Sequence, residues 1–135
     1  MGADSHAGSL RQRIVVIDDH EASRHLVRDT LAFAGYEVCT AKDAEAGLAL
    51  CRTVGCALVI LDIRLPGAMD GYQAVASLRS DPLLRTTRAI ALTAQAFPGD
   101  RATALAAGFD EYLAKPVRLP ELREAVDRLL GLGRG

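Results

Sequence analysis

The chain has 135 residues, 50% of them hydrophobic and 24% charged, with a formal net charge of −1. This length suits one domain with a hydrophobic core, and the composition is globular, which excludes a disordered chain. A net charge this close to zero gives no positive electrostatic potential that would attract nucleic acid. No apolar run approaches the roughly 20 residues of a membrane span.

Short apolar runs and helical patterns alternate along the chain. Residues 1–12 are expected to form a flexible tail, residues 13–130 the domain, and residues 131–135 a tail or the start of a linker. Continuous, often β-branched runs predict strands at residues 14–17, 36–40, 57–61, 89–92 and 111–114. Apolar residues at helical spacing predict helices at about residues 21–34, 43–53, 70–78, 100–108 and 120–130.

Residues at the expected helix ends support these boundaries. Gly35 stands where a C-cap glycine belongs, and Asp43 and Asp100 are available as N-caps of the helices that follow them. Pro120 falls in the first turn of the last helix, where its missing N–H costs least.

The strict alternation of strands and helices predicts an α/β domain. It would be a single doubly wound sheet of five parallel strands with five helices on its two faces. Right-handed crossovers leave few topologies for such a chain. The flavodoxin-like strand order 2-1-3-4-5 fits best because it places the first strand beside the third. This choice rests on known folds rather than on the sequence alone.

Four of the predicted strands end on residues that bind phosphate or metal. Asp18 and Asp19 follow the first strand, Asp62 the third, Thr93 the fourth and Lys115 the fifth. Parallel α/β sheets bind ligands outside the carboxyl ends of their strands. Three carboxylates, a hydroxyl and an ammonium are therefore expected to converge on one pocket.

Three clustered carboxylates call for a cation. Like charges about 4 Å apart repel by on the order of 4 kcal/mol at an effective dielectric near 20. Carboxylates without Cys or His suit a hard ion, and Mg²⁺ prefers a few carboxylates, waters and a phosphate. Asp62 is the natural nucleophile, because a carboxylate can form an aspartyl phosphate with little activation beyond alignment. Lys115 and Thr93 would stabilise the oxygens of the transferring phosphoryl group.

Each of these residues also has an ordinary structural interpretation. An aspartate after a strand is commonly a turn former or an N-cap, Thr93 is an acceptable strand residue, and Lys115 can be a solvated charge. The ordinary interpretation has to hold at four strand ends together, however, so the pattern favours the phosphoryl site.

The histidines and cysteines indicate no second metal site. Cys39, Cys51 and Cys56 lack metal-site spacing and are expected to be buried small side chains in a reducing compartment. His20 and His25 lie near the start of the first predicted helix. Neither has a Cys or His partner at ligand spacing, so both are expected to be solvated.

From residue 13 to residue 130 the chain resembles the receiver domain of two-component response regulators. The resemblance rests on motifs at four strand ends, namely Val16-Ile17-Asp18-Asp19, Leu61-Asp62-Ile63-Arg64-Leu65-Pro66 followed by Met69-Asp70-Gly71, Ala91-Leu92-Thr93-Ala94, and Tyr112-Leu113-Ala114-Lys115-Pro116. Together these motifs are highly specific. They imply a phosphoacceptor in phosphorelay signalling that assists its own phosphorylation and dephosphorylation and is not an enzyme in the usual sense.

The resemblance implies a role for each site residue. Asp62 is the phosphoacceptor and, with Asp19, a direct Mg²⁺ ligand. Asp18 binds the ion through water, and the backbone carbonyl of Arg64 is a further ligand. Lys115 matches the lysine that binds the phosphoryl group, and the peptide bond after it is expected to be cis.

A conformational switch is also implied by the resemblance. Thr93 is drawn toward the phosphoryl group, and Tyr112 moves into the space that Thr93 leaves. This changes the surface of the fourth helix, the fifth strand and the fifth helix. The alternative that Tyr112 is an edge aromatic residue that only packs stays open.

The implied partners are a histidine kinase or a histidine phosphotransfer protein, and a downstream protein that binds the switch surface. Kinase choice is expected to reside in exposed side chains such as Glu21, Arg24 and Arg28. We expect a cytoplasmic protein, because residues 1–13 do not resemble a signal peptide, with no direct binding of nucleic acid and no membrane insertion. The expected state is a monomer or a weak, phosphorylation-dependent dimer.

Two departures from the family pattern and several alternatives remain. The loop of residues 66–71 is one residue longer than the commonest form, and Arg64 and Gln95 occupy variable positions that tune phosphoryl lifetime.

The receiver either stands alone or belongs to a hybrid histidine kinase or larger regulator. A pseudo-receiver would lack phosphorylation, although its five site residues are intact here. A haloacid-dehalogenase-like phosphatase needs an aspartate two positions after its nucleophile, where this chain has Arg64.

Overall fold

Five parallel strands form the centre of the structure, a computed structural model that describes residues 12–131. The strands are β1 (Arg13–Ile17), β2 (Glu37–Ala41), β3 (Leu58–Asp62), β4 (Arg88–Thr93) and β5 (Glu111–Ala114). They pair in the order β2-β1-β3-β4-β5, which confirms the predicted order 2-1-3-4-5. The expected tails, residues 1–12 and 131–135, lie outside the described residues apart from Gln12 and Gly131.

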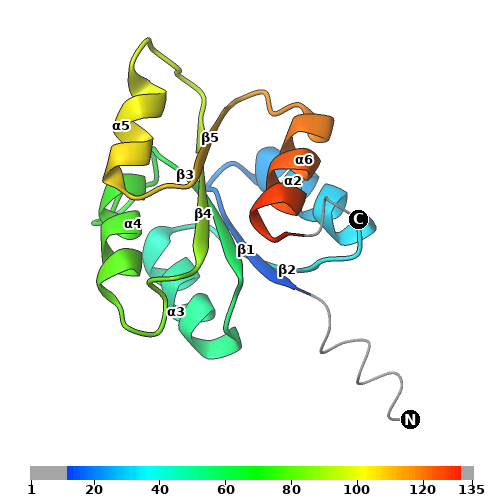
Figure 1. The fold of residues 1–135 in the computed structure, drawn as a ribbon, viewed down its shortest axis with the longest axis horizontal. Helices are drawn as coiled ribbons and strands as arrows, with labels where there is room; N and C mark the ends of the chain where they lie inside the picture. Colours follow the sequence, from blue (N-terminus) through cyan, green and yellow to red (C-terminus); the bar gives the residue numbers. More distant parts are fainter. Residues whose placement is uncertain (1–11, 132–135) are drawn as a thin grey trace.

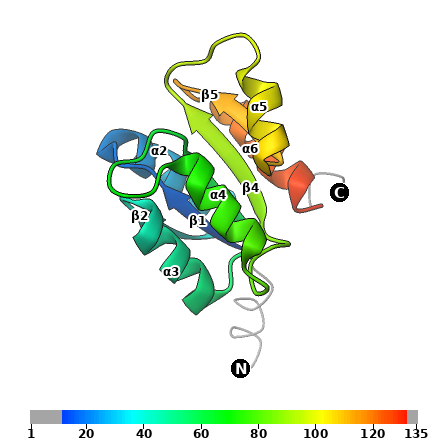
Figure 2. The same ribbon diagram turned by 90° about the vertical axis from the view of Figure 1, so that its left-hand side faces the viewer.

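Helices cover both faces of the sheet, as predicted for a doubly wound fold. They are α2 (Glu21–Phe33), α3 (Ala44–Val54), α4 (Gly71–Ser80), α5 (Asp100–Ala107) and α6 (Leu119–Leu129). Figures 1 and 2 show α3, α4 and α5 on one face and α2 and α6 on the other. Among residues 12–131, no helix is both long and apolar enough to span a bilayer.

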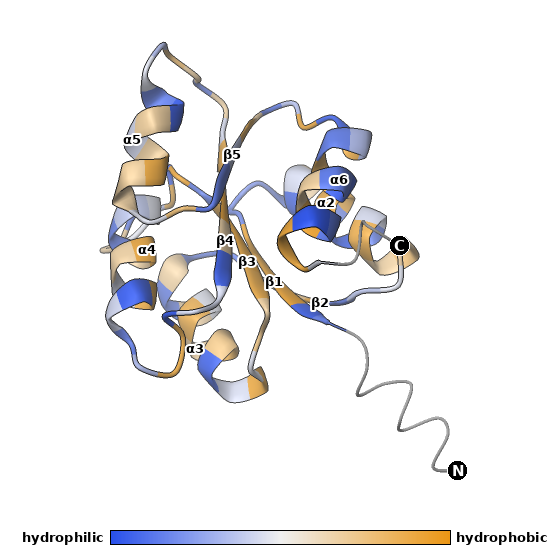
Figure 3. Cartoon of the chain, in the orientation of Figure 1, coloured by the Kyte–Doolittle hydropathy of each residue, from blue (hydrophilic) through white to orange (hydrophobic). Residues whose placement is uncertain are grey.

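The central strand β3 explains why its segment is one uninterrupted apolar run. Every residue of β3 is buried, and successive side chains alternate between two hydrophobic clusters. Val59 and Leu61 pack into the cluster beneath α3, α4 and α5, whereas Leu58 and Ile60 pack into the cluster beneath α2 and α6. Figure 3 shows mostly hydrophobic strands at the centre, flanked by helices that carry both hydrophobic and hydrophilic residues. Each such aliphatic side chain contributes about 1.5–3 kcal/mol on burial, so this strand anchors both layers.

Two aspartates cap helices that begin near the ends of strands. Asp43 accepts the backbone N–H of Ala46 at 2.8 Å, which confirms its predicted role as N-cap of α3. Asp70 and Gln73 form a reciprocal capping box at the start of α4, each side chain accepting the other's backbone N–H at 2.9 Å. The α4 cap closes the loop that leaves β3.

The prediction that Asp100 caps its helix is wrong. The N-cap of α5 is Gly99, which has a left-handed φ of +90°, and Asp100 is already the first helical residue. Its carboxylate instead reaches back and accepts the backbone N–H of Phe97 at 2.8 Å. Glycine adopts the left-handed conformation without steric cost, so the helix begins at the residue directly after it.

Gly71 holds the long loop of residues 63–70 tightly against the end of β3. Its backbone N–H donates to the carbonyl of Ile63 at 2.9 Å. A Cβ at this position would lie 2.6 Å from Ile63 Cα and 2.7 Å from the carbonyl oxygen of Asp62. Only glycine fits this approach without moving the backbone that carries Asp62.

We predict that Gly71→Ala lowers the free energy of unfolding by about 1–3 kcal/mol, the usual cost of forcing atoms into a packed site. An unstrained Gly→Ala change would raise it by about 0.4–1 kcal/mol. Urea denaturation of both proteins measures the difference. Unchanged or increased stability of the variant would contradict the close approach.

Candidate functional site

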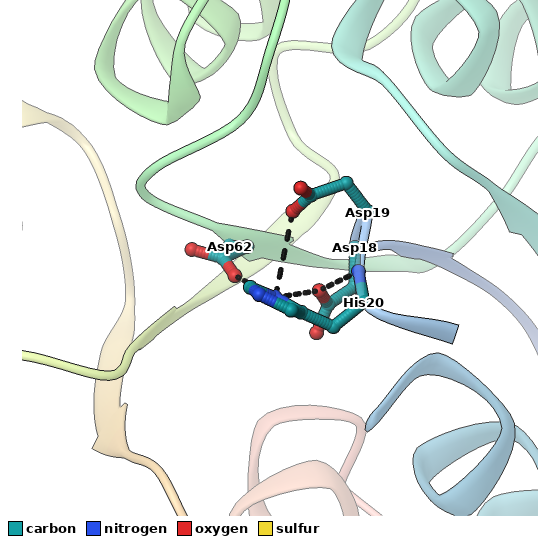
Figure 4. Close-up of side chains that lie close together, drawn as sticks. All are labelled: Asp18, Asp19, His20 and Asp62. Atoms are coloured by element: carbon teal, nitrogen blue, oxygen red, sulfur yellow. Dashed lines mark hydrogen bonds and ion pairs between the residues drawn. The ribbon is translucent and has the colours of Figure 1, made fainter. Parts of the chain in front are cut away.

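Three carboxylates meet where β1 and β3 end. The parallel register pairs Ile17 with Leu61, and this places Asp18 and Asp62 next to each other beyond the paired residues. Figure 4 shows Asp19 and His20 facing the same space. One ligand atom from each of Asp18, Asp19, His20 and Asp62 lies within 4.8 Å of the others. The expected convergence of the three aspartates is therefore present.

Lys115, directly after β5, closes the cluster from the other side. Its Nζ donates a hydrogen bond to Asp62 Oδ2 at 2.7 Å and lies 2.9 Å from Asp18 Oδ2. Its backbone N–H donates to the carbonyl of Thr93 at 2.7 Å, and its peptide bond to Pro116 is cis, as the resemblance implied. The ammonium thus neutralises two carboxylates that would otherwise repel each other.

Asp18 is fully buried and yet stays ionised. Burial opposes its charge, but the backbone N–H of His20, at 2.9 Å, and the Lys115 ammonium outweigh burial and hold the pKa of Asp18 below its ordinary value. Burial also opposes the charge of Lys115, but Asp62 and Asp18 raise the pKa of Lys115 above its ordinary value. At neutral pH the site is a network of buried charges.

Asp62 is held in one orientation through both of its oxygens. Its side chain is 3% exposed; Oδ1 accepts the backbone N–H of Arg64 at 2.8 Å, and Oδ2 accepts Lys115. A carboxylate fixed in this way satisfies the positioning that nucleophilic attack requires. A pocket beside it is lined by residues at the ends of β3 and β4 and in the loops that follow them, including Arg64, Thr93 and Gln95.

Thr93 ends β4 and Tyr112 lies on β5, three residues before Lys115. The Thr93 hydroxyl donates to the carbonyl of Gln95 at 3.1 Å and accepts the backbone N–H of Gln95 at 3.2 Å. Tyr112 is 9% exposed, and within residues 12–131 its buried hydroxyl has no hydrogen-bond partner. Burial, together with the charge of Asp100, raises the pKa of Tyr112.

Two further residues belong to this neighbourhood. His20 is solvated as expected, with its side chain 65% exposed, and its Nδ1 also lies 3.5, 3.6 and 3.9 Å from oxygens of Asp18, Asp19 and Asp62. Arg24, expected to be exposed, is buried and donates to the carbonyl of Asp18 at 3.0 Å. The signal for His20 was its place directly after the acidic pair; no sequence signal marked Arg24.

The donor set fits a hard divalent cation. The acidic cluster supplies carboxylate oxygens from two strand ends. In the described part of the chain, the buried Asp18 Oδ2 has the Lys115 ammonium, 2.9 Å away, as its one charged neighbour and makes no further hydrogen bond. Buried carboxylate oxygens without donors are costly unless an ion or water satisfies them. Asp18, Asp19 and Asp62 would hold such an ion.

Comparison with known proteins gives a consistent picture. The family model described as response regulator receiver domain matches residues 14–127. The response regulator PleD of Caulobacter vibrioides is 36% identical over 108 residues, which cover 80% of this chain and 24% of PleD. The polar-differentiation response regulator DivK of Brucella ovis is 30% identical over 122 residues, which cover 90% of this chain and 98% of DivK.

A similar solved structure is the receiver domain of the sensor histidine kinase PA1611 from Pseudomonas aeruginosa, with a magnesium ion coordinated in its active-site cleft. It is 32% identical with a TM-score of 0.81, and the match covers 90% of this chain and 98% of that one. The chain spans nearly all of DivK, but only 24–48% of the length of several other curated relatives.

We predict that Lys115→Met, in the presence of a chelator, lowers the free energy of unfolding at pH 7 by about 3–5 kcal/mol, because two buried carboxylates lose their partner. The depressed pKa of Asp18 means that this carboxylate stabilises the fold above the ordinary aspartate pKa, about 3.9, and that the stabilisation is lost as the pH falls through its folded pKa. The difference in the free energy of unfolding between Lys115→Met and wild type should therefore shrink below about pH 4.

Urea denaturation across this pH range measures the effect. Lys42→Met is the matched control, because Lys42 is the other lysine of the chain and is exposed. A difference that stays constant down to acidic pH would contradict a charge-based role of Lys115.

Proposed function

The chain belongs to the receiver domains of response regulators in two-component signalling, and we propose that it accepts a phosphoryl group on Asp62. The observation that carries the proposal is the carboxylate of Asp62, buried and held 2.7 Å from the Lys115 ammonium beside Asp18 and Asp19. The ordinary interpretation of these residues as turn formers does not account for an oriented carboxylate inside a charge network.

In the proposed reaction a carboxylate oxygen of Asp62 attacks the phosphorus of a phosphohistidine. The new P–O bond forms as the P–N bond breaks, and the imidazole of the donor leaves. Lys115 moves from the Asp62 carboxylate to an oxygen of the transferred group and balances its charge. The Thr93 hydroxyl, now bound to the backbone of Gln95, rotates to donate to another of these oxygens.

Magnesium would neutralise charge on the phosphoryl group and on the acidic cluster. Asp19 and Asp62 would bind the ion directly, Asp18 through a water, and the backbone carbonyl of Arg64 would complete the protein ligands. The acidic cluster and the burial of the Asp18 carboxylate within it support this assignment. The magnesium ion in the PA1611 receiver domain is a further argument by similarity.

We assign the output to the surface of α5, β5 and α6, which are the expected fourth helix, fifth strand and fifth helix. Rotation of Thr93 toward the phosphoryl group would enlarge the space behind it, and Tyr112 would occupy this space more fully. Tyr112 is already 9% exposed here, so phosphorylation would need only to favour a buried position of this ring. The partnerless Tyr112 hydroxyl leaves that conformation incompletely satisfied.

Charge interactions connect the three elements of this surface. Glu111, at the start of β5, lies 2.6 Å from Arg101 of α5 and 2.8 Å from Arg128 of α6. Burial opposes its charge, but the backbone N–H of Tyr112 and the two guanidinium groups hold the pKa of Glu111 below its ordinary value. A shift of β5 at Tyr112 would therefore reach both helices.

The proposed phosphoryl donor is a histidine kinase or a histidine phosphotransfer protein, and a downstream protein would bind the α5–β5–α6 surface. The domain would span residues 13–130 and act in the cytoplasm as a monomer or a weak dimer formed on phosphorylation. It would stand alone, like DivK in length, or form part of a longer regulator, as the PleD match does.

Incubation with acetyl phosphate and Mg²⁺ should add one phosphoryl group to the intact protein, detected by mass spectrometry. The gain should disappear in Asp62→Asn and in a chelated sample, because the first removes the nucleophile and the second the charge neutralisation. Asp29→Asn, a change of an exposed aspartate on α2, should leave the gain unchanged. Equal phosphorylation of Asp62→Asn and wild type would exclude Asp62 as the acceptor.

Phosphorylation should also change amide hydrogen exchange in peptides of α5, β5 and α6 by about fivefold or more, the lower range of typical coupling. Peptides of α3, on the far side of α4, should be unaffected. The comparison uses phosphorylated wild type against Asp62→Asn treated in the same way. Changes confined to the loops around Asp62 would contradict the assigned output surface.

A further inference from the structure

His20 has an unusual place at the mouth of the acidic cluster. It occupies the N-cap position of α2, yet its side chain makes no capping hydrogen bond. The ring instead turns toward the three carboxylates, as Figure 4 shows. Histidine is not among the favoured N-cap residues, so local helix capping does not explain this orientation.

The backbone of His20 fixes the ring in this position. Its N–H donates to Asp18 Oδ1 at 2.9 Å, and this ties the residue to one of the carboxylates that it faces. The ring nitrogen Nδ1 then lies 3.5 Å from Asp18 Oδ1, 3.6 Å from Asp19 Oδ1 and 3.9 Å from Asp62 Oδ2. One nitrogen thus faces an oxygen from each of the three aspartates.

These separations suit ligands that share one ion. Six ligands at about 2.1 Å from a cation are separated by about 3.0 Å when adjacent and by about 4.2 Å when opposite. All three distances from Nδ1 lie between these two values, so small side-chain shifts would bring the nitrogen to a ligand separation. They are too long for strong hydrogen bonds, and Lys115 already supplies a positive charge to Asp18 and Asp62. Ion pairing of an exposed imidazolium would add little.

An independent observation indicates that the cluster is built for a cation. Asp18 is fully buried, and in the described residues its Oδ2 has only the Lys115 ammonium, 2.9 Å away, as a charged neighbour and no further donor. The oxygens and the His20 nitrogen together form a mixed donor set. Oxygen ligands suit Mg²⁺, whereas an imidazole nitrogen favours first-row transition metals over it.

We propose that Nδ1 of His20 is a direct ligand of the cation at this site and makes the site selective for divalent transition-metal ions, with Mn²⁺ as the test case, over Mg²⁺. The inference rests on the proposed function, because it adds a ligand to the cation site that Asp18, Asp19 and Asp62 define. It concerns which ion the site prefers and is independent of whether Asp62 accepts phosphate.

The first test is direct. Mn²⁺-loaded protein, studied by electron spin-echo envelope modulation at one fixed pH, should show the modulation of a coordinated imidazole nitrogen. The modulation should vanish in His20→Phe, which keeps a planar ring without a nitrogen, and persist in His25→Phe, a change of the neighbouring histidine on α2. If His20→Phe does not fold, His20→Asn, with a favoured N-cap residue, replaces it.

The second test measures affinities. His20→Phe should weaken Mn²⁺ binding about tenfold, the lower end of the usual effect of removing a group that supports a metal site. Mg²⁺ binding, measured by competition, should change much less. Equal losses for the two ions, or nitrogen modulation that survives in the variant, would overturn the proposal while leaving the phosphoacceptor function intact. Absence of any Mn²⁺ or Mg²⁺ binding would overturn it together with the cation site of the proposed function.

Discussion

The contact of Lys115 with Asp18 and Asp62 is the interaction on which the site depends. The parallel pairing of β1 with β3 places two carboxylates at adjacent strand ends, in a region that excludes most water. Their repulsion would work against the strand pairing that supports the hydrophobic core. The ammonium of Lys115, directly after β5 and two strands away from β3, offsets this repulsion and makes the folding of the whole sheet depend on charge compensation.

The backbone around the cluster is held by contacts that carry no charge of their own. Gly71 lies so close to Ile63 and Asp62 that the loop after β3 has little freedom. Arg24 fixes the carbonyl of Asp18 from α2. The acidic side chains therefore project from a rigid frame, which is how an oriented nucleophile can be maintained without a bound substrate.

The sequence predicted the scaffold better than the side-chain directions. Buried parallel strands read as continuous apolar runs, so β3 and the strand-end positions of Asp62 and Lys115 could be located in advance. The strand order needed knowledge of existing folds. The ring of His20 and the burial of Arg24 could not be foreseen, because both depend on how α2 leaves β1 in three dimensions. Asp100 failed as a cap because Gly99 adopts a left-handed backbone that no pattern of polarity reveals.

Glu111 gives the α5–β5–α6 surface a form of redundancy. A buried carboxylate with a single partner becomes an uncompensated charge when that partner leaves, which costs about 3–5 kcal/mol. Glu111 has one guanidinium group from each of two helices, Arg101 and Arg128. Either helix can move away while the other still neutralises the charge. The surface can therefore loosen at one helix at a time. Two binding partners that recognise different helices would then meet different energy barriers when they displace α5 or α6.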